Sequence, residues 1–137
     1  MADKIKYQDG YKYQLVQIYA TIIAIRPPAR IESTYIVLDT DGTLSIRPGY
    51  AWDGPSGPTI DTKNFMRGSL VHDALYQLMR MELLPQSCRL LADEELHRAC
   101  RDDGMSWIRA WYVKRALLRA GAPAASPSHK KTILEAP

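Results

Sequence analysis

The segment from Pro48 to Pro58 constrains the fold more than any other part of the chain. It reads Pro-Gly-Tyr-Ala-Trp-Asp-Gly-Pro-Ser-Gly-Pro, with three glycines and three prolines in eleven residues. Proline removes a backbone donor that helices and central strands need, and glycine weakens both elements, so the segment is predicted to be a loop. Tyr50 and Trp52 within it indicate a loop that packs down on the protein. It separates a strand-like sequence from a helix-like one.

The residues before this loop favour β-structure. Residues 11–25 are rich in Tyr, Val, Ile and Thr and are predicted to form one or two strands. Residues 35–38 and 43–46 flank the sequence Asp39-Thr40-Asp41-Gly42, which is typical of a β-hairpin because the Asp-Gly step supplies a positive φ. An antiparallel sheet is therefore expected within about the first 46 residues.

The residues after the loop favour three helices. The first is expected from Asp61 or Thr62, which are good N-cap residues, to about Met81. Gly68 inside it suggests close packing against a neighbour. The second is expected from Pro85 or Ser87 to Asp103, where Gly104 ends it, and the third over residues 106–120. Trp107, Trp111 and Leu118 recur at helical spacing in the third helix and are predicted to face the core. The fold class is predicted to be α+β, with the sheet packed against the helices.

Length and composition predict one globular domain. The chain has 137 residues, 46% hydrophobic and 24% charged, which is enough for one core. Residues 1–121 are expected to form the domain, and residues 122–137, rich in Ala, Pro and Ser, a flexible tail. The net charge of +3 permits an anionic partner such as a phospholipid surface, whereas binding to nucleic acid is not expected.

Neither a membrane-spanning segment nor a signal peptide is recognised in the sequence, so the protein is expected to be made in the cytoplasm. Cys88 and Cys100 should lie on one helix about 18 Å apart, too far for a disulfide. Both are expected to be small core residues of a reducing compartment.

The candidate site is the sequence His72-Asp73-Ala74-Leu75-Tyr76. On a helix, His72, Asp73 and Tyr76 fall within a sector of roughly 100°. Asp93 follows on the next helix, 93 − 72 = 21 residues later, and the short connection predicts an antiparallel helix pair that brings Asp93 back to His72. A nitrogen of His72 is therefore expected within about 3 Å of an oxygen of Asp93.

This set of residues suits a hydrolytic reaction. A histidine whose far nitrogen is held by a buried aspartate can act as a general base toward water. Asp73 with backbone carbonyl groups near Gly54 and Gly57 would offer the oxygen ligands that Ca²⁺ prefers, and such a cation could polarise a carbonyl group. Tyr76 can donate a hydrogen bond to these carboxylates.

These motifs resemble the phospholipase A2 superfamily, above all its compact form in parvovirus capsid proteins, where a Gly-Pro-Gly loop precedes His-Asp-x-x-Tyr and Ala-Asp follows. Over about residues 35–121 the chain also resembles a small phage and prophage protein family with a hairpin, a Leu-His-Asp-x-Leu-Tyr helix and a Trp/Tyr-rich helix. The second likeness implies association with virion proteins.

The first likeness implies a phospholipid ester hydrolase in which His72 is the base, with Tyr76 and Asp93 supporting it. It also implies that Asp73 binds Ca²⁺ near Gly54 and Gly57. The chain departs from the superfamily in having no cysteine beside the histidine. Its prolines at positions 55 and 58 remove two loop amides, so Asp53 or Asp61 is the expected substitute ligand.

One other reading is disfavoured by the sequence, and two remain open. A phosphohydrolase of the His-Asp type would need a further histidine before position 72, and the sequence has none there. A transition-metal site could be built from His72, Asp73, Asp93 and His97. A non-catalytic phage structural or interaction protein could keep the same helix pair, with the polar residues fixing the helix crossing.

Overall fold

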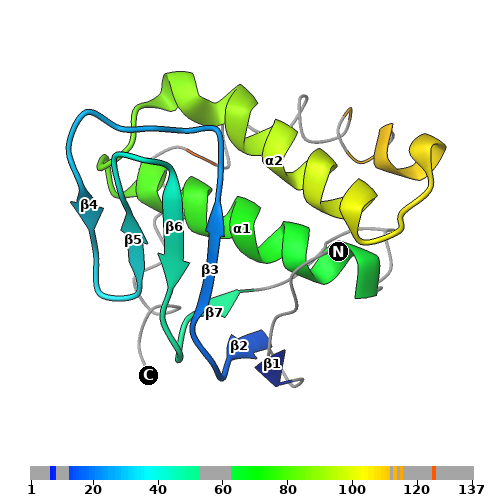
Figure 1. Cartoon of the computed structure of the whole chain (residues 1–137), viewed down its shortest axis with the longest axis horizontal. Coiled ribbons are helices and arrows are strands. Elements are labelled where there is room, and N and C mark those ends of the chain that lie inside the picture. The colour runs from blue at the N-terminus through cyan, green and yellow to red at the C-terminus, as the bar shows by residue number, and fades with distance from the viewer. Residues whose placement is uncertain are drawn as a thin grey trace.

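The computed structural model describes residues 7–8, 13–52, 63–111, 113, 115 and 125, and it has an α+β fold (Figure 1). The strands precede the helices along the chain, as the sequence predicts. The elements are β1 (Tyr7–Gln8), β2 (Tyr13–Leu15), β3 (Tyr19–Ile22), β4 (Ile31–Glu32), β5 (Ile36–Leu38), β6 (Thr43–Ile46), β7 (Ala51–Trp52), α1 (Lys63–Arg80), the 3₁₀ turn η1 (Gln86–Cys88) and α2 (Arg89–Asp102).

The strands form two antiparallel sheets, with the orders β1-β2-β7 and β3-β6-β5-β4. The predicted hairpin is confirmed as β5 and β6. Its turn needs glycine because Gly42 has a φ of +91° and an added Cβ would collide with the carbonyl oxygen of Ile23. Asp41 Oδ1 closes the turn by accepting a hydrogen bond from the Thr43 amide at 2.9 Å.

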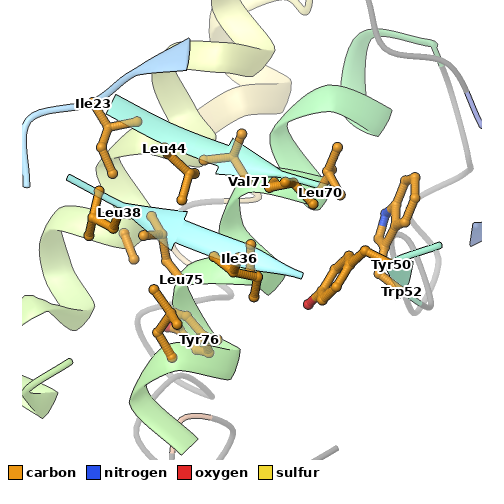
Figure 2. Close-up of a cluster of buried hydrophobic side chains, with 14 of the residues drawn as sticks. Ile23, Ile36, Leu38, Leu44, Tyr50, Trp52, Leu70, Val71, Leu75 and Tyr76 are labelled. Carbon is orange, nitrogen blue, oxygen red and sulfur yellow. The ribbon is translucent and has the colours of Figure 1, made fainter. Parts of the chain in front are cut away.

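The main core lies between β5, β6 and α1 (Figure 2). Burying these aliphatic side chains removes apolar surface from water at about 25 cal/mol per Å², which is the main force holding the sheet on the helix. The labelled side chains of this contact include those of Ile36, Leu38 and Leu44 from the strands and those of Leu70, Val71 and Leu75 from α1.

The helices α1 and α2 run antiparallel and approach closely at Gly68 (Figure 1). A Cβ on Gly68 would lie 2.7 Å from Leu96 Cδ1, 3.1 Å from Cys100 Sγ and 3.2 Å from the Leu96 carbonyl oxygen. The expectation that this glycine permits close packing is confirmed. The second helix stops as predicted, because Asp103 caps it and Gly104 adopts a φ of +97°.

The segment predicted to be a loop, residues 48–58, contains a short strand, β7. Ala51 pairs with Gln14 and Trp52 with Tyr13, so β7 adds an edge to the smaller sheet. Proline flanks this strand without interrupting it, which explains why the composition of the segment conceals it. The prediction that the aromatic residues pack down is confirmed, because Tyr50 and Trp52 are buried.

The third helix differs from its prediction. Residues 107–111, 113 and 115 are helical, but Trp107 and Trp111 are exposed, so the prediction that they face the core is wrong for both. Ala110 and Val113 pack on α2 instead, which turns the tryptophans outward. Leu118 lies outside the described residues.

Ala125 lies in the segment expected to be a flexible tail, yet it is buried, and its carbonyl oxygen accepts a hydrogen bond from Gln86 Nε2 at 2.7 Å. At this residue the chain is packed on the domain. The other residues of 122–137 lie outside the described part, so the domain boundary at residue 121 stays a prediction. Cys88 and Cys100 are free, as expected. Among the described residues, no helix is long and apolar enough to cross a membrane.

Candidate functional site

The candidate site is the only place where residues 66–80 of α1 reach the surface. Every residue of α1 from position 66 to position 80 is buried except His72 and Asp73. The side chains of these two residues are each 13% exposed. A helix that is buried on all sides is normally hydrophobic all round. A partly exposed His-Asp pair at the middle of such a helix is therefore a candidate for a role other than packing.

His72 meets Asp93 as the sequence predicts. His72 Nε2 lies 2.7 Å from Asp93 Oδ1, and the Tyr76 hydroxyl donates to the same oxygen at 2.7 Å. The Asp93 side chain is fully buried. The antiparallel pairing of α1 and α2, with a short connection between them, produces this contact from residues 21 positions apart.

The hydrogen bond to Asp93 orients the imidazole ring. In a neutral imidazole that faces an ionised carboxylate, which only accepts hydrogen bonds, Nε2 carries the proton and Nδ1 keeps a lone pair. Within the described residues Nδ1 makes no hydrogen bond. The Tyr76 ring lies 4.0 Å from the imidazole, centroid to centroid, and limits its rotation. The arrangement thus presents one basic nitrogen held in a fixed orientation.

Tyr76 is a neutral donor in this cluster. Burial raises the pKa of its phenol far above the usual value, and the hydrogen bond to the Asp93 carboxylate raises it further. The hydroxyl therefore keeps its proton at neutral pH and supplies a hydrogen bond to Asp93. The second carboxylate oxygen of Asp93, Oδ2, is buried and has no hydrogen-bond partner among the described residues. A buried acceptor of this kind leaves the site with unused hydrogen-bonding capacity.

Asp73 has protein partners of its own. Its Oδ2 accepts a hydrogen bond of 2.5 Å from the Tyr50 hydroxyl, and its Oδ1 lies 3.8 Å from Arg80 Nη1. Arg80 is buried, and its Nη1 also donates to Gln77 Oε1. A carboxylate facing a buried guanidinium already has its charge balanced, which disfavours a second cation at the same oxygen.

Among the described residues, no group of three or more His, Cys, Asp and Glu side chains could hold a metal ion. The predicted ligands Asp53, Gly54, Gly57 and Asp61 lie outside the described residues. His72, Asp73, Asp93 and His97 are all described, and they do not form such a group, so the transition-metal set is not supported. Calcium binding through the loop stays a prediction.

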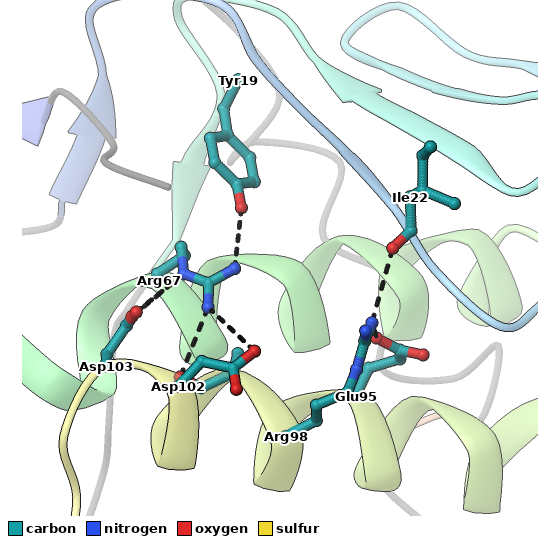
Figure 3. Close-up of polar contacts among 8 residues, drawn as sticks. Tyr19, Ile22, Arg67, Glu95, Arg98, Asp102 and Asp103 are labelled. Atoms are coloured by element: carbon teal, nitrogen blue, oxygen red, sulfur yellow. Dashed lines mark hydrogen bonds and ion pairs between the residues drawn. The ribbon is translucent and has the colours of Figure 1, made fainter. Parts of the chain in front are cut away.

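The sequence analysis missed two polar clusters that join the sheet to α2 (Figure 3). Arg67 Nε donates to both carboxylate oxygens of Asp103 at 3.2 and 3.0 Å, and its Nη1 donates to the Tyr19 hydroxyl at 3.0 Å. Burial alone would lower the pKa of Arg67, but these hydrogen bonds outweigh it and the net pKa is raised. Arg67 therefore stays charged, and each of its three guanidinium nitrogens donates a hydrogen bond.

In the second cluster, Glu95 Oε2 accepts a hydrogen bond from the Ala24 amide at 2.9 Å, and Glu95 Oε1 forms an ion pair with Arg98. The contacts that tie each cluster to a distant segment carry no local motif, because Arg67 lies 36 positions from Asp103 and Glu95 lies 71 positions from Ala24. The only local signal is the i,i+3 pair of Glu95 and Arg98.

A separate apolar cavity of about 460 Å³ lies between the loop before β4 and the connection of α1 to α2. Leu83, Leu84, Pro85 and Cys88 are among its lining residues. None of His72, Asp73, Tyr76 and Asp93 lines it, so it is distinct from the candidate site.

Comparison of the chain with protein-family models, with curated proteins and with solved structures finds no match. The likenesses to the phage family and to the phospholipase A2 superfamily therefore stay predictions from sequence motifs. The geometry of the His72 cluster is the main basis for inferring a function.

Proposed function

We propose that the protein is an ester hydrolase in which His72 activates water. The observation that carries this proposal is the hydrogen bond of His72 Nε2 to the buried Asp93, at the only opening along residues 66–80 of α1. The bond leaves the basic Nδ1 available at a partly exposed position, which is what a general base requires.

The reaction would proceed in two proton transfers. Nδ1 accepts a proton from water as the water oxygen attacks the ester carbonyl carbon, and Asp93 stabilises the imidazolium that forms. The same proton then passes from Nδ1 to the departing alkoxide as the ester C–O bond breaks. The products are a carboxylic acid and an alcohol, and His72 returns to its starting state.

The substrate class follows from the likeness of His72-Asp73-x-x-Tyr76 and Ala92-Asp93 to the phospholipase A2 motifs. We propose the acyl ester of a glycerophospholipid as the substrate. Bound Ca²⁺ would polarise the carbonyl group if the loop containing Asp53, Gly54 and Gly57 supplies its ligands together with Asp73. Since the partners of Asp73 balance its charge, the protein could also act without Ca²⁺. Hydrolysis without added Ca²⁺ would support that alternative.

A second candidate function is a non-catalytic phage structural or interaction protein that associates with virion proteins. The observation that favours it is the position of Asp93, whose hydrogen bonds link α1 to α2 and would fix the helix crossing. In that case His72 contributes to stability alone.

The test incubates purified protein with mixed phospholipid vesicles, with and without Ca²⁺, and measures released fatty acid and lysolipid. His72→Ala should reduce turnover about 10²–10⁴-fold while the protein stays folded. His97→Ala is the matched control, because His97 is a partly exposed histidine on the facing helix. Thermal unfolding of both variants verifies the fold. No release above the His72→Ala background under any cation would favour the structural role.

Calcium is tested independently of turnover. A ligand that binds only the folded state raises the melting temperature as its concentration rises. If the loop and Asp73 bind Ca²⁺, the melting temperature should rise with Ca²⁺, and Asp73→Asn should weaken that rise. An unchanged melting temperature together with hydrolysis would show that the reaction needs no Ca²⁺.

A further inference from the structure

The helical segment after Gly104 is apolar on two faces. On one face, Ala110 and Val113 pack with Leu96, Cys100 and Met105 of α2 and the turn. On the other, large hydrophobic side chains are in contact with water. They are Trp107, 63% exposed, Ile108, 61% exposed, and Trp111, 40% exposed. Core packing accounts for the first face and not for the second.

The exposed side chains form one surface. At about 100° per residue, Trp107, Ile108 and Trp111 lie within a sector of roughly 100°, and Arg115 falls in the same sector. The guanidinium of Arg115 lies over the Trp111 ring at 5.1 Å from its centroid, a cation–π contact that joins a charge to the aromatic surface. We refer to Trp107, Ile108, Trp111 and Arg115 as the tryptophan face.

The sequence around this face is strongly basic. Residues 106–121 contain four Lys and Arg residues and no Asp or Glu, although the net charge of the whole chain is only +3. The positive excess is therefore concentrated in this segment. A contiguous apolar surface with positive charge on a helix is typical of a binding surface for an anionic partner.

We propose that the tryptophan face docks the protein on anionic phospholipid surfaces. Tryptophan prefers the boundary between lipid headgroups and acyl chains, because its ring is apolar and its N–H is polar. Ile108 would enter the apolar side of that boundary, and Arg115 would contact lipid phosphate. This inference rests on the proposed function for its choice of phospholipid as the partner.

Two other partners fit less well. A second copy of this chain would bring one basic segment against another, and like charges that face each other are destabilising. Nucleic acid would use the arginines and could stack bases on the tryptophans, but it offers no apolar partner for the exposed Ile108.

The protein carries its own reporter for the test. The chain has three tryptophans, and Trp52 is buried with its Nε1 donating to Ser69 Oγ at 3.0 Å. Changes in tryptophan fluorescence therefore report on Trp107 and Trp111. The full chain carrying His72→Ala is titrated with vesicles of phosphatidylcholine alone or mixed with phosphatidylglycerol, so that no hydrolysis alters the lipid.

Mixed vesicles should shift the emission to the blue and sediment the protein, whereas phosphatidylcholine vesicles should do so far more weakly. Trp107→Gln with Ile108→Gln should weaken sedimentation about tenfold or more, because the apolar contact is lost. Arg115→Gln should weaken it about fivefold, and added salt should remove that difference. Leu90→Gln, at an exposed leucine of α2, is the matched control and should bind like the parent.

Equal binding by all variants, or no binding to mixed vesicles, would overturn the proposal. So would a blue shift that grows with protein concentration alone, which would indicate self-association, or binding to a single-stranded oligonucleotide without binding to vesicles. The outcomes also separate the two proposals. Hydrolysis of a soluble short-chain ester without vesicle binding would retain only the catalytic proposal, and vesicle binding without turnover only the docking proposal.

Discussion

The Arg67 cluster and the His72 cluster both connect α1 to α2, and they differ in how completely their hydrogen-bonding groups are paired. Arg67 donates to both oxygens of Asp103 and to Tyr19 and Ala99, so each of its three guanidinium nitrogens makes a hydrogen bond. In the other cluster, His72 uses one ring nitrogen, and Asp93 leaves Oδ2 without a partner among the described residues.

The difference separates a structural role of buried polar residues from a reactive one. A fully paired cluster fixes the position of one element on another, and it has no group left to react with a ligand. A partly paired cluster costs stability, so its position at the accessible middle of a buried helix is the reason we propose a catalytic role for it. The four predictions that follow test this contrast.

Among the residues that support His72, Asp93→Asn should have the largest effect on turnover, between the effects of His72→Ala and Tyr76→Phe. An amide at this position can hold the imidazole in the wrong tautomer, so we expect about a 10³-fold loss, equivalent to about 4 kcal/mol of barrier. Steady-state hydrolysis and thermal unfolding would be measured on the same samples. A variant with full activity would remove Asp93 from the mechanism.

Arg67→Ala should have the largest effect on stability. It leaves Asp103 and Tyr19 without their partner, which should cost about 3 kcal/mol in the free energy of unfolding. Denaturant titration measures this cost. Arg98→Ala is the control, because its pairing with Glu95 is largely exposed on the arginine side and should contribute less than about 1 kcal/mol. Equal losses in the two variants would contradict the view of Arg67 as the main connection.

Alkaline pH should unfold the protein through two buried groups, Cys100 and Tyr76. Burial raises the pKa of the Cys100 thiol to about 12, with a contribution from Asp103, and the pKa of Tyr76 is raised as well. A raised folded-state pKa gives stability that is complete below the unfolded-state pKa and is lost as pH rises toward the folded value. Between about pH 9 and 12, Cys100 should therefore cost up to about 1.4 kcal/mol per pH unit.

Denaturant titration from about pH 8 upward would measure this slope. Cys100→Ala should reduce the slope of the free energy of unfolding against pH from about pH 9 upward. Tyr76→Phe should reduce that slope only above about pH 10, where a free phenol ionises. A pH dependence that neither variant alters would assign alkaline unfolding to other groups.

Tyr76→Phe should have the smallest effect. It removes one supporting hydrogen bond to Asp93, worth about 1 kcal/mol, and keeps the ring that packs on His72. We expect about a fivefold loss of turnover. A loss as large as that of His72→Ala would instead make the hydroxyl a reacting group.

Local sequence signals predicted much of this molecule. Asp41-Gly42 fixed the hairpin, Gly104 marked the end of α2, and the 21-residue offset placed Asp93 on His72, because each depends on neighbours in sequence or on one short connection. The strand β7 was missed because its signal lies in pairing with residues about 40 positions away.

The outward turn of Trp107 and Trp111 was missed for a related reason. Helical spacing reveals that a stripe exists, but which side of the helix meets α2 depends on the packing of Ala110 and Val113. Likewise, the partners of Arg67 follow from the three-dimensional arrangement, which a motif cannot encode.

The pairing of β2 with β7 has a consequence for the order of folding during synthesis. Strands β2 to β7 are complete before the first residue of α1 leaves the ribosome, so both sheets can pair early. Their apolar side has no cover until α1 arrives, and exposed strands of this kind are prone to aggregation. The contact between His72 and Asp93 must form later still, after most of α2 has been made. The nascent chain should therefore need chaperone protection most while residues from about 52 to 80 are leaving the ribosome.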